Sequence, residues 1–145
     1  MAISPIIDSS VLVDMFLETS ARHAVAASLA DALIARDVEL AVPGFALFEV
    51  RSALSQAKIE HRLKMANGIT KSRPLKIRIV PIDEAFVERY LDPSLPHLKG
   101  CDLVFLAMAK RDGAPLVTED AKMYEAAKAT GVAVYITAEY LASLE

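Results

Sequence analysis

Short apolar runs recur along the chain, and longer stretches with apolar residues at every third or fourth position separate them. The runs are Ile3–Ile7, Glu39–Val42, Ile77–Ile82, Pro115–Thr118 and Val132–Ile136. Each run is rich in β-branched or aliphatic residues and too short for an isolated helix. The pattern therefore predicts five buried strands.

The stretches between these runs have helical spacing. They are Ala21–Arg36, Phe45–Ile59, Asp83–Leu91, Asp102–Lys110, Ala121–Thr130 and Ala138–Leu144. Gly113 and Gly131 follow two of them, where a left-handed residue commonly ends a helix. Strands that alternate with helices predict an α/β fold, with a mainly parallel sheet covered by helices on both faces.

Length and composition narrow the class of protein. The 145 residues contain no repeat and no linker, so we expect one domain over residues 1–145. The single cysteine, Cys101, excludes an intrachain disulfide and a Cys₂His₂ zinc site, and it fits a cytoplasmic location. No secretion signal is evident, and no apolar run approaches the roughly 18–20 residues of a membrane span.

Charge is unevenly distributed. Residues 51–78 hold eight Lys or Arg and a single acid, Glu60, a local charge of +7 in a chain whose net charge is −3. The remainder therefore carries −10. A basic lobe beside an acidic remainder suits a protein that holds both phosphates and metal cations, although a solvated helical face gives the same pattern.

Four acids stand where a site is expected. In parallel sheets function gathers at the carboxyl ends of the strands. Asp8 follows the first predicted strand directly, and Asp120 follows the fourth. Glu49 lies beside the apolar stripe of its predicted helix, and Asp102 opens another helix. Thr118 shares strand parity with Asp120, so its hydroxyl can orient that carboxylate, whereas Glu119 points the other way.

Each acid also has an ordinary structural explanation. Asp8, Asp102 and Asp120 stand where acids cap helices, and Glu49 could pair with Arg51. Together, however, four carboxylates at one end of a sheet repel one another unless a cation neutralises them. Hard oxygen ligands suit Mg²⁺ or Mn²⁺, and phosphodiester hydrolysis is chemistry that such a site performs.

Other chemistries lack their motifs. There is no phosphate-binding glycine loop, no dinucleotide fingerprint and no nucleophile elbow. The three histidines, His23, His61 and His97, show no metal-binding spacing.

The residues resemble the PIN-domain family. The blocks that carry the resemblance are Ile6–Leu12, Pro43 with Phe48–Leu54, Asp102 with Ala107 and Ala109, Gly113–Asp120, and Gly131–Val134. The resemblance implies a three-layer α/β/α sandwich with sheet order 3-2-1-4-5, and a Mg²⁺- or Mn²⁺-dependent endoribonuclease. It implies that Asp8, Glu49, Asp102 and Asp120 bind metal, and that the hydroxyls of Ser10 and Thr118 orient them.

Single-domain members of the family that have this length most often resemble VapC-type toxins of prokaryotic toxin–antitoxin pairs. That likeness implies an RNA substrate, a small cognate antitoxin and a homodimer. The residues that we expect to contact RNA phosphates are Arg51, Lys58, Arg62, Lys64, Lys71 and Arg73.

One position departs from the family pattern. Some members have a further acid two residues after the last aspartate, where this chain has Lys122. That departure puts a second metal ion in doubt. The alternative function is a PIN-like module that binds RNA or protein without cleaving.

Overall fold

The computed structural model describes residues 3–56 and 75–145. Its strands are β1 (Ile6–Ile7), β2 (Glu39–Pro43), β3 (Lys76–Val80), β4 (Leu116–Val117) and β5 (Val134–Tyr135). They form one parallel sheet in the order β3-β2-β1-β4-β5. The predicted fold class and strand order are confirmed.

Several strands are shorter than the apolar runs that predicted them. Pro5 and Pro115 precede β1 and β4, and proline has no backbone N–H to donate to a neighbouring strand. Their carbonyls still accept hydrogen bonds, from the Ala41 N–H at 2.9 Å and the Ile6 N–H at 2.8 Å respectively. The regular ladder therefore begins only at the residue after each proline.

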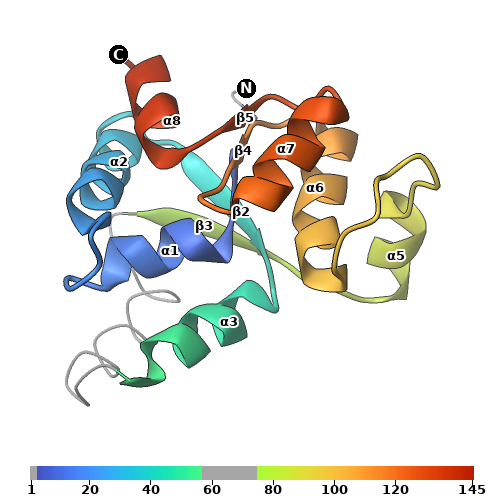
Figure 1. Ribbon diagram of the computed structural model, residues 1–145, viewed down its shortest axis with the longest axis horizontal. Helices are drawn as coiled ribbons and strands as arrows, with labels where there is room; N and C mark the ends of the chain where they lie inside the picture. The colour runs from blue at the N-terminus through green and yellow to red at the C-terminus, as the bar shows by residue number, and fades with distance from the viewer. Residues whose placement is uncertain (1–2, 57–74) are drawn as a thin grey trace.

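Helices pack on both sides of the sheet (Figure 1). On one side lie α1 (Ser9–Phe16), α2 (His23–Ala35) and α8 (Thr137–Ser143), with α2 contacting both of the others. On the other side α6 (Gly100–Asp112) packs against β1, β2 and β4, and α5 (Glu84–Tyr90) and α7 (Ala121–Ala129) flank it. This is the three-layer arrangement that the alternating pattern predicted.

After β2 the chain forms α3 (Ala46–Ala53) and a 3₁₀ turn, η1 (Leu54–Gln56). The helix predicted for Phe45–Ile59 is confirmed in this part, and its last three residues lie outside the described residues. The left-handed positions are confirmed as well. Gly113 ends α6 with φ 62° and Gly131 follows α7 with φ 82°.

Helix α1 was not among the predicted helices. Its apolar residues Val11, Leu12, Val13, Met15 and Phe16 are nearly continuous over two turns, so they show no clear three-to-four spacing. Val11, Leu12 and Met15 are buried. The sequence indicated only that a helix could follow Asp8.

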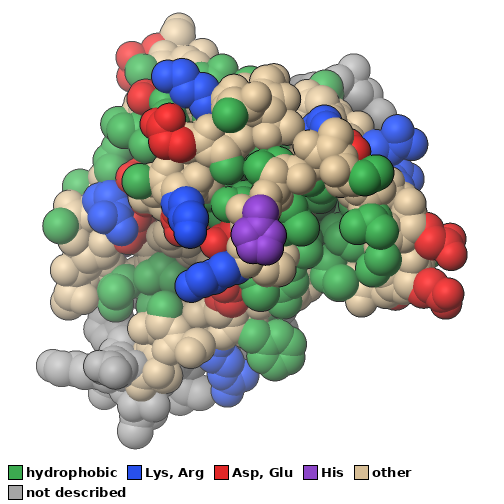
Figure 2. Space-filling model, turned by 45° about the vertical axis from the view of Figure 1, so that its right-hand side comes forward, with side chains coloured by type: hydrophobic (Ala, Val, Ile, Leu, Met, Phe, Trp, Pro, Cys, Tyr) green, Lys and Arg blue, Asp and Glu red, His purple; other side chains and the backbone are tan. Residues whose placement is uncertain are grey.

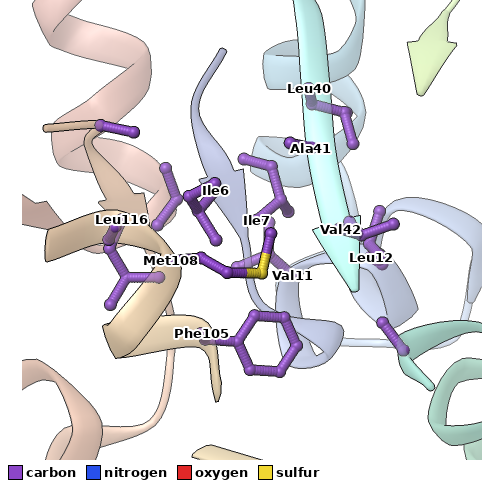
Figure 3. Packing of buried hydrophobic residues seen from close by; sticks show 14 of the residues in the cluster. Ile6, Ile7, Val11, Leu12, Leu40, Ala41, Val42, Phe105, Met108 and Leu116 are labelled. Atoms are coloured by element: carbon purple, nitrogen blue, oxygen red, sulfur yellow. The ribbon is translucent and has the colours of Figure 1, made fainter. Parts of the chain in front are cut away.

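The core lies between the sheet and these helices. Figure 3 shows Phe105 and Met108 of α6 against Ile6 and Ile7 of β1, with Val42 of β2 nearby. Because the central strands are buried on both faces, their positions are fixed by packing on two sides. The carboxyl ends of these strands are therefore rigid supports for side chains. No helix in the described ranges has both the length and the apolar character needed to cross a membrane.

Candidate functional site

The four predicted acids lie at the carboxyl edge of the sheet. Asp8 follows β1, and Asp120 follows β4 after Thr118 and Glu119. Glu49 lies in α3, which begins shortly after β2. Asp102 is the third residue of α6. Because α6 leads back to the start of β4, its first turn lies at the same carboxyl edge. Four separate segments thus contribute one carboxylate each.

Asp8 is fixed in both backbone and side chain. Its N–H donates to the Val117 carbonyl at 3.0 Å, which joins it to β4. Its side chain is 5% exposed, and its Oδ2 accepts hydrogen bonds from the Ser10 and Thr118 hydroxyls, each at 2.8 Å. Asp8 is the N-cap residue of α1, yet its side chain makes no capping hydrogen bond. The capping alternative therefore does not explain its carboxylate.

The same two hydroxyls extend the network to the loop after β4. The Thr118 Oγ1 accepts from the Asp120 N–H at 3.0 Å, and the Ser10 Oγ accepts from the Glu119 N–H at 3.2 Å. Asp120 itself does cap α7, because its Oδ1 accepts from the Met123 N–H at 3.0 Å. One oxygen of Asp120 therefore has a structural role, while Oδ2 makes no hydrogen bond within the described residues.

Glu49 has a partner that the sequence did not suggest. The Ser9 hydroxyl donates to the Glu49 Oε1 at 2.9 Å, joining α1 to α3 across forty positions of sequence. The alternative of a salt bridge with Arg51 finds no support, since Arg51 is exposed and no such ion pair occurs among the described residues. Successive residues on a helix point about 100° apart, so adjacent Ser9 and Ser10 can serve Glu49 and Asp8 separately.

An aromatic contact aligns α3 with α6. Phe45, immediately before α3, packs edge-on against Phe105, with ring centroids 5.5 Å apart and an interplanar angle of 82°. Glu49 is one turn beyond Phe45, and Asp102 is nearly one turn before Phe105. This contact holds the two acid-bearing turns next to each other. Asp102 is not a capping residue, because the N-cap of α6 is Lys99.

Burial and like charge act together on these acids. Burial raises the pKa of Asp8, and the charge of Asp102 raises it further, against the hydrogen bonds from Ser10, Thr118 and the Ser9 backbone. Burial likewise raises the pKa of Glu49, with contributions from Asp8 and Asp102. For Asp102, burial and the charge of Asp120 raise the pKa. The carboxylates are thus close enough to oppose one another's ionisation.

The negative charge at this edge has no paired cation within residues 3–56 and 75–145. Among the residues that the structure describes, no Lys or Arg forms an ion pair with any of the four carboxylates. Buried charges are normally paired or bind metal. The donor atoms are all carboxylate and hydroxyl oxygens, which is the set that Mg²⁺ and Mn²⁺ prefer.

The spacing of the acids also bears on such an ion. In the described ranges no three acidic, His or Cys side chains stand close enough to hold one ion together as they are placed. Mg²⁺ retains several waters and is usually bound through one or two carboxylates. The residues therefore fit a hydrated ion that contacts some acids directly and others through water.

The side chains of two other acids, Glu119 and Asp112, do not point into this edge. The Glu119 Oε1 accepts from the Thr137 N–H at 3.1 Å, at the start of α8, as its strand parity predicted. Asp112 lies at the far end of α6, where the Tyr90 hydroxyl bonds it at 3.2 Å. Both can serve as controls for substitutions in the four acids.

Of the predicted phosphate-binding residues, Arg51 is exposed in the last turn of α3, the helix that carries Glu49. The other five, Lys58, Arg62, Lys64, Lys71 and Arg73, lie outside the described residues.

Comparisons with known proteins agree with this architecture. A model of the PIN domain matches residues 6–129, while a search of curated protein sequences gave no match. The fold is similar to that of FitAcB from Neisseria gonorrhoeae, with a TM-score of 0.61 and 20% identity over 91% of this chain and 96% of that one.

Two further structures are similar over comparable lengths. VapC20 from Mycobacterium tuberculosis, described as a toxin that cleaves the sarcin–ricin loop, has a TM-score of 0.63 and 15% identity over 89% of this chain and 96% of its own. VapBC2 from Rickettsia felis, bound to promoter DNA, has a TM-score of 0.62 and 15% identity over 90% of this chain and 96% of that one. At these identities the likeness shows a shared fold.

Proposed function

Because the chain belongs to the PIN-domain family, we propose that it is an endoribonuclease that hydrolyses RNA phosphodiester bonds with Mg²⁺ or Mn²⁺. The observation that carries this proposal is the buried Asp8, whose charge has no cationic partner among the described residues and lies among other carboxylates. Asp8, Glu49, Asp102 and Asp120 would hold the metal, which when bound polarises water and offsets charge on the phosphate.

The protein's own contribution is placement. Ser10 and Thr118 fix one oxygen of Asp8, so its other oxygen has a defined direction. Ser9 restrains Glu49, and the capping bond to Met123 restrains Asp120. Carboxylates held in this way lose little further freedom when they bind a cation.

We further propose that the chain is the toxin of a prokaryotic toxin–antitoxin pair, with a small antitoxin as its partner, and that it is a cytoplasmic homodimer. The toxin role and the antitoxin partner are supported by the similarity to VapC20, described as a toxin, and to the VapBC2 structure. An upstream reading frame for a short DNA-binding protein would add to that support.

The deciding experiment is an RNA cleavage assay on four charge-removing variants. Asp8→Asn, Glu49→Gln, Asp102→Asn and Asp120→Asn retain shape and remove one charge each. We expect each to slow cleavage of structured RNAs in Mn²⁺ by a factor on the order of 100 or more, because cation placement depends on every carboxylate. Glu119→Gln and Asp112→Asn, whose side chains face away, should cleave at the wild-type rate.

Thermal melts of all six variants separate loss of function from loss of fold. An acid whose removal leaves cleavage unchanged does not belong to the site. If the wild type binds RNA and cuts none of a broad panel of RNAs in Mn²⁺, the non-cleaving PIN-like module replaces the nuclease.

A further inference from the structure

Two lysines stand beside Asp102, each supplied by a different helix. Lys99 is the N-cap residue of α6, and Lys122 is the second residue of α7. The two helices pack against each other, and both begin at the carboxyl edge of the sheet (Figure 1). This chain direction brings both lysines to the edge that carries the four acids.

Neither ammonium group is committed to a partner. In the described part of the chain the ion-pairing bases are Arg22, Lys76, Arg78, Arg89 and Lys110. The side chains of Lys99 and Lys122 are exposed, and neither ammonium group forms a hydrogen bond or ion pair with a described residue. Their charges nonetheless reach Asp102, where both partly offset the rise in the pKa of that carboxyl.

The lysines are therefore near the acids without neutralising them. A surface lysine that served only to balance an acid would be expected at ion-pair distance from that acid. Neither Lys99 nor Lys122 forms an ion pair with a described acid. Figure 2 shows, on one face of the molecule, Lys and Arg side chains bordering acidic ones next to a histidine. A phosphate group that approached this edge would meet carboxylate repulsion in the centre and free ammonium groups at the margin.

We propose that Lys99 and Lys122 form a two-point anchor for the backbone phosphates of single-stranded RNA beside Asp102. The inference rests on the proposed function and gives that site its substrate contacts. Lysine carries a compact charge on a flexible stem and binds phosphate without a fixed orientation. Lys122 thereby supplies positive charge near the position where some members of the family have a further acid.

The test is RNA binding without cleavage. A fluorescein-labelled oligouridylate is titrated in EDTA at several salt concentrations with the wild type, Lys99→Gln, Lys122→Gln, the double variant and Lys122→Arg. Removing one lysine–phosphate interaction with a single strand lowers the slope of log affinity against log salt by about 0.7. We expect that decrease in each glutamine variant, about twice that decrease in the double variant, and near wild-type binding for Lys122→Arg.

Lys128→Gln is the matched control. Lys128 is an exposed lysine of the same helix, α7, six residues beyond Lys122, so about 9 Å further along the axis. Its substitution removes the same net charge and should leave the slope unchanged. Thermal melts confirm that all variants are folded.

Equal slopes for Lys122→Gln, Lys99→Gln and the wild type would overturn the anchor. So would equal decreases in Lys122→Gln and Lys128→Gln, because the effect would then be one of net charge. If either result accompanies normal RNA cleavage by the wild type in Mn²⁺, the nuclease proposal stands without the anchor. A wild type that neither binds nor cleaves RNA overturns both.

Discussion

Two buried aspartates six residues apart have opposite surroundings. Asp14, 3% exposed, forms an ion pair with Arg22 Nε at 2.7 Å and accepts from the Ser20 hydroxyl at 2.6 Å. Its backbone carbonyl also lies 2.8 Å from the His23 Nδ1. In the part of the chain that the structure describes, Asp8, 5% exposed, has only neutral hydroxyls and a backbone N–H as donors, and its charged neighbours there are acids.

The difference separates an acid that is paired within the protein from one that, under the proposed function, would bind a cation. At Asp14 the protein supplies the compensating charge, and the contact fastens the loop between α1 and α2. At Asp8 the hydroxyls supply orientation, and no residue that the structure describes pairs its charge. Burial alone therefore does not mark a functional acid, and the identity of its partners does.

Thermal melts with and without Mn²⁺ should separate these two aspartates most clearly. At one hundred times Kd, Mn²⁺ should stabilise the wild type by about 2.7 kcal/mol. Asp14→Asn should lose about 1–3 kcal/mol through its weakened buried contacts and keep the full response to Mn²⁺. Asp8→Asn should melt at or above the wild-type temperature in EDTA, since it relieves repulsion, and should lose most of that response.

The contrast fails if both variants respond to Mn²⁺ as the wild type does. It also fails if Asp14→Asn is the variant whose metal response disappears.

The hydroxyls that orient the acids should have smaller effects. Ser9→Ala, Ser10→Ala and Thr118→Ala each remove one donor to Glu49 or Asp8. We expect a 10–100-fold loss in metal affinity or cleavage, as is usual when an indirect partner of a metal ligand is removed. Ser20→Ala, which removes a donor to Asp14, is the matched control and should change stability alone. Equal cleavage by Ser9→Ala and the wild type would show that Glu49 needs no restraint.

The smallest effect concerns pH. The pKa values of Asp8, Glu49 and Asp102 are raised above 3.8, 4.5 and 3.8 respectively. Between the ordinary pKa values of these acids and their raised values in the folded protein, the folded protein therefore binds more protons than the unfolded chain. Their contribution to the free energy of unfolding must fall over that window and stay constant above it.

In EDTA, the stability of Asp8→Asn relative to the wild type should therefore increase with pH from about 4 upward. Subtracting the wild-type stability from that of Asp8→Asn cancels the contributions of acids that both proteins share. These include acids with a lowered pKa, such as Asp92, whose pKa is lowered by Lys110. Urea titrations at a series of pH values provide the measurement. A difference that shrinks with rising pH contradicts the assigned direction. Mn²⁺ should reduce the wild-type loss, because metal competes with protons for the same oxygens.

Much of the fold followed from local pattern. Strand and helix periods specified the layers, and the resemblance supplied the strand order. The exact ends of the strands depended on hydrogen bonding between neighbouring strands, and the periodicity of one segment does not contain that information. Pro5 and Pro115 shortened β1 and β4, and α1 was missed because its apolar residues are nearly continuous over two turns.

The site divides in the same way. Strand ends indicated Asp8 and Asp120, and parity indicated the outward direction of Glu119, which agrees with its hydrogen bond. Parity also indicated Thr118, but its hydroxyl donates to the carboxylate of Asp8 and not to that of Asp120, which it was expected to orient. The partnership of Ser9 and Glu49 joins residues forty positions apart. The one sequence signal for this partnership was that Ser9 stands next to Ser10. Two neighbouring residues of a helix point in different directions, so the Ser9 hydroxyl needs a partner other than Asp8. The metal-binding roles of the four acids stay predictions.

The hydrogen bond between Thr118 and Asp8 spans 110 positions of the chain. Parallel pairing of β1 with β4 must therefore precede it, and such long-range closure is slow compared with helix formation. While the polypeptide is being synthesised, Asp8 is made 110 residues before Thr118, which supplies its second hydroxyl. A nascent or truncated chain that ends before residue 118 lacks both the Thr118 hydroxyl and the Asp120 carboxylate. Assembly order thus delays the completed acid cluster, and any activity that depends on it, until residues 118–120 have been synthesised.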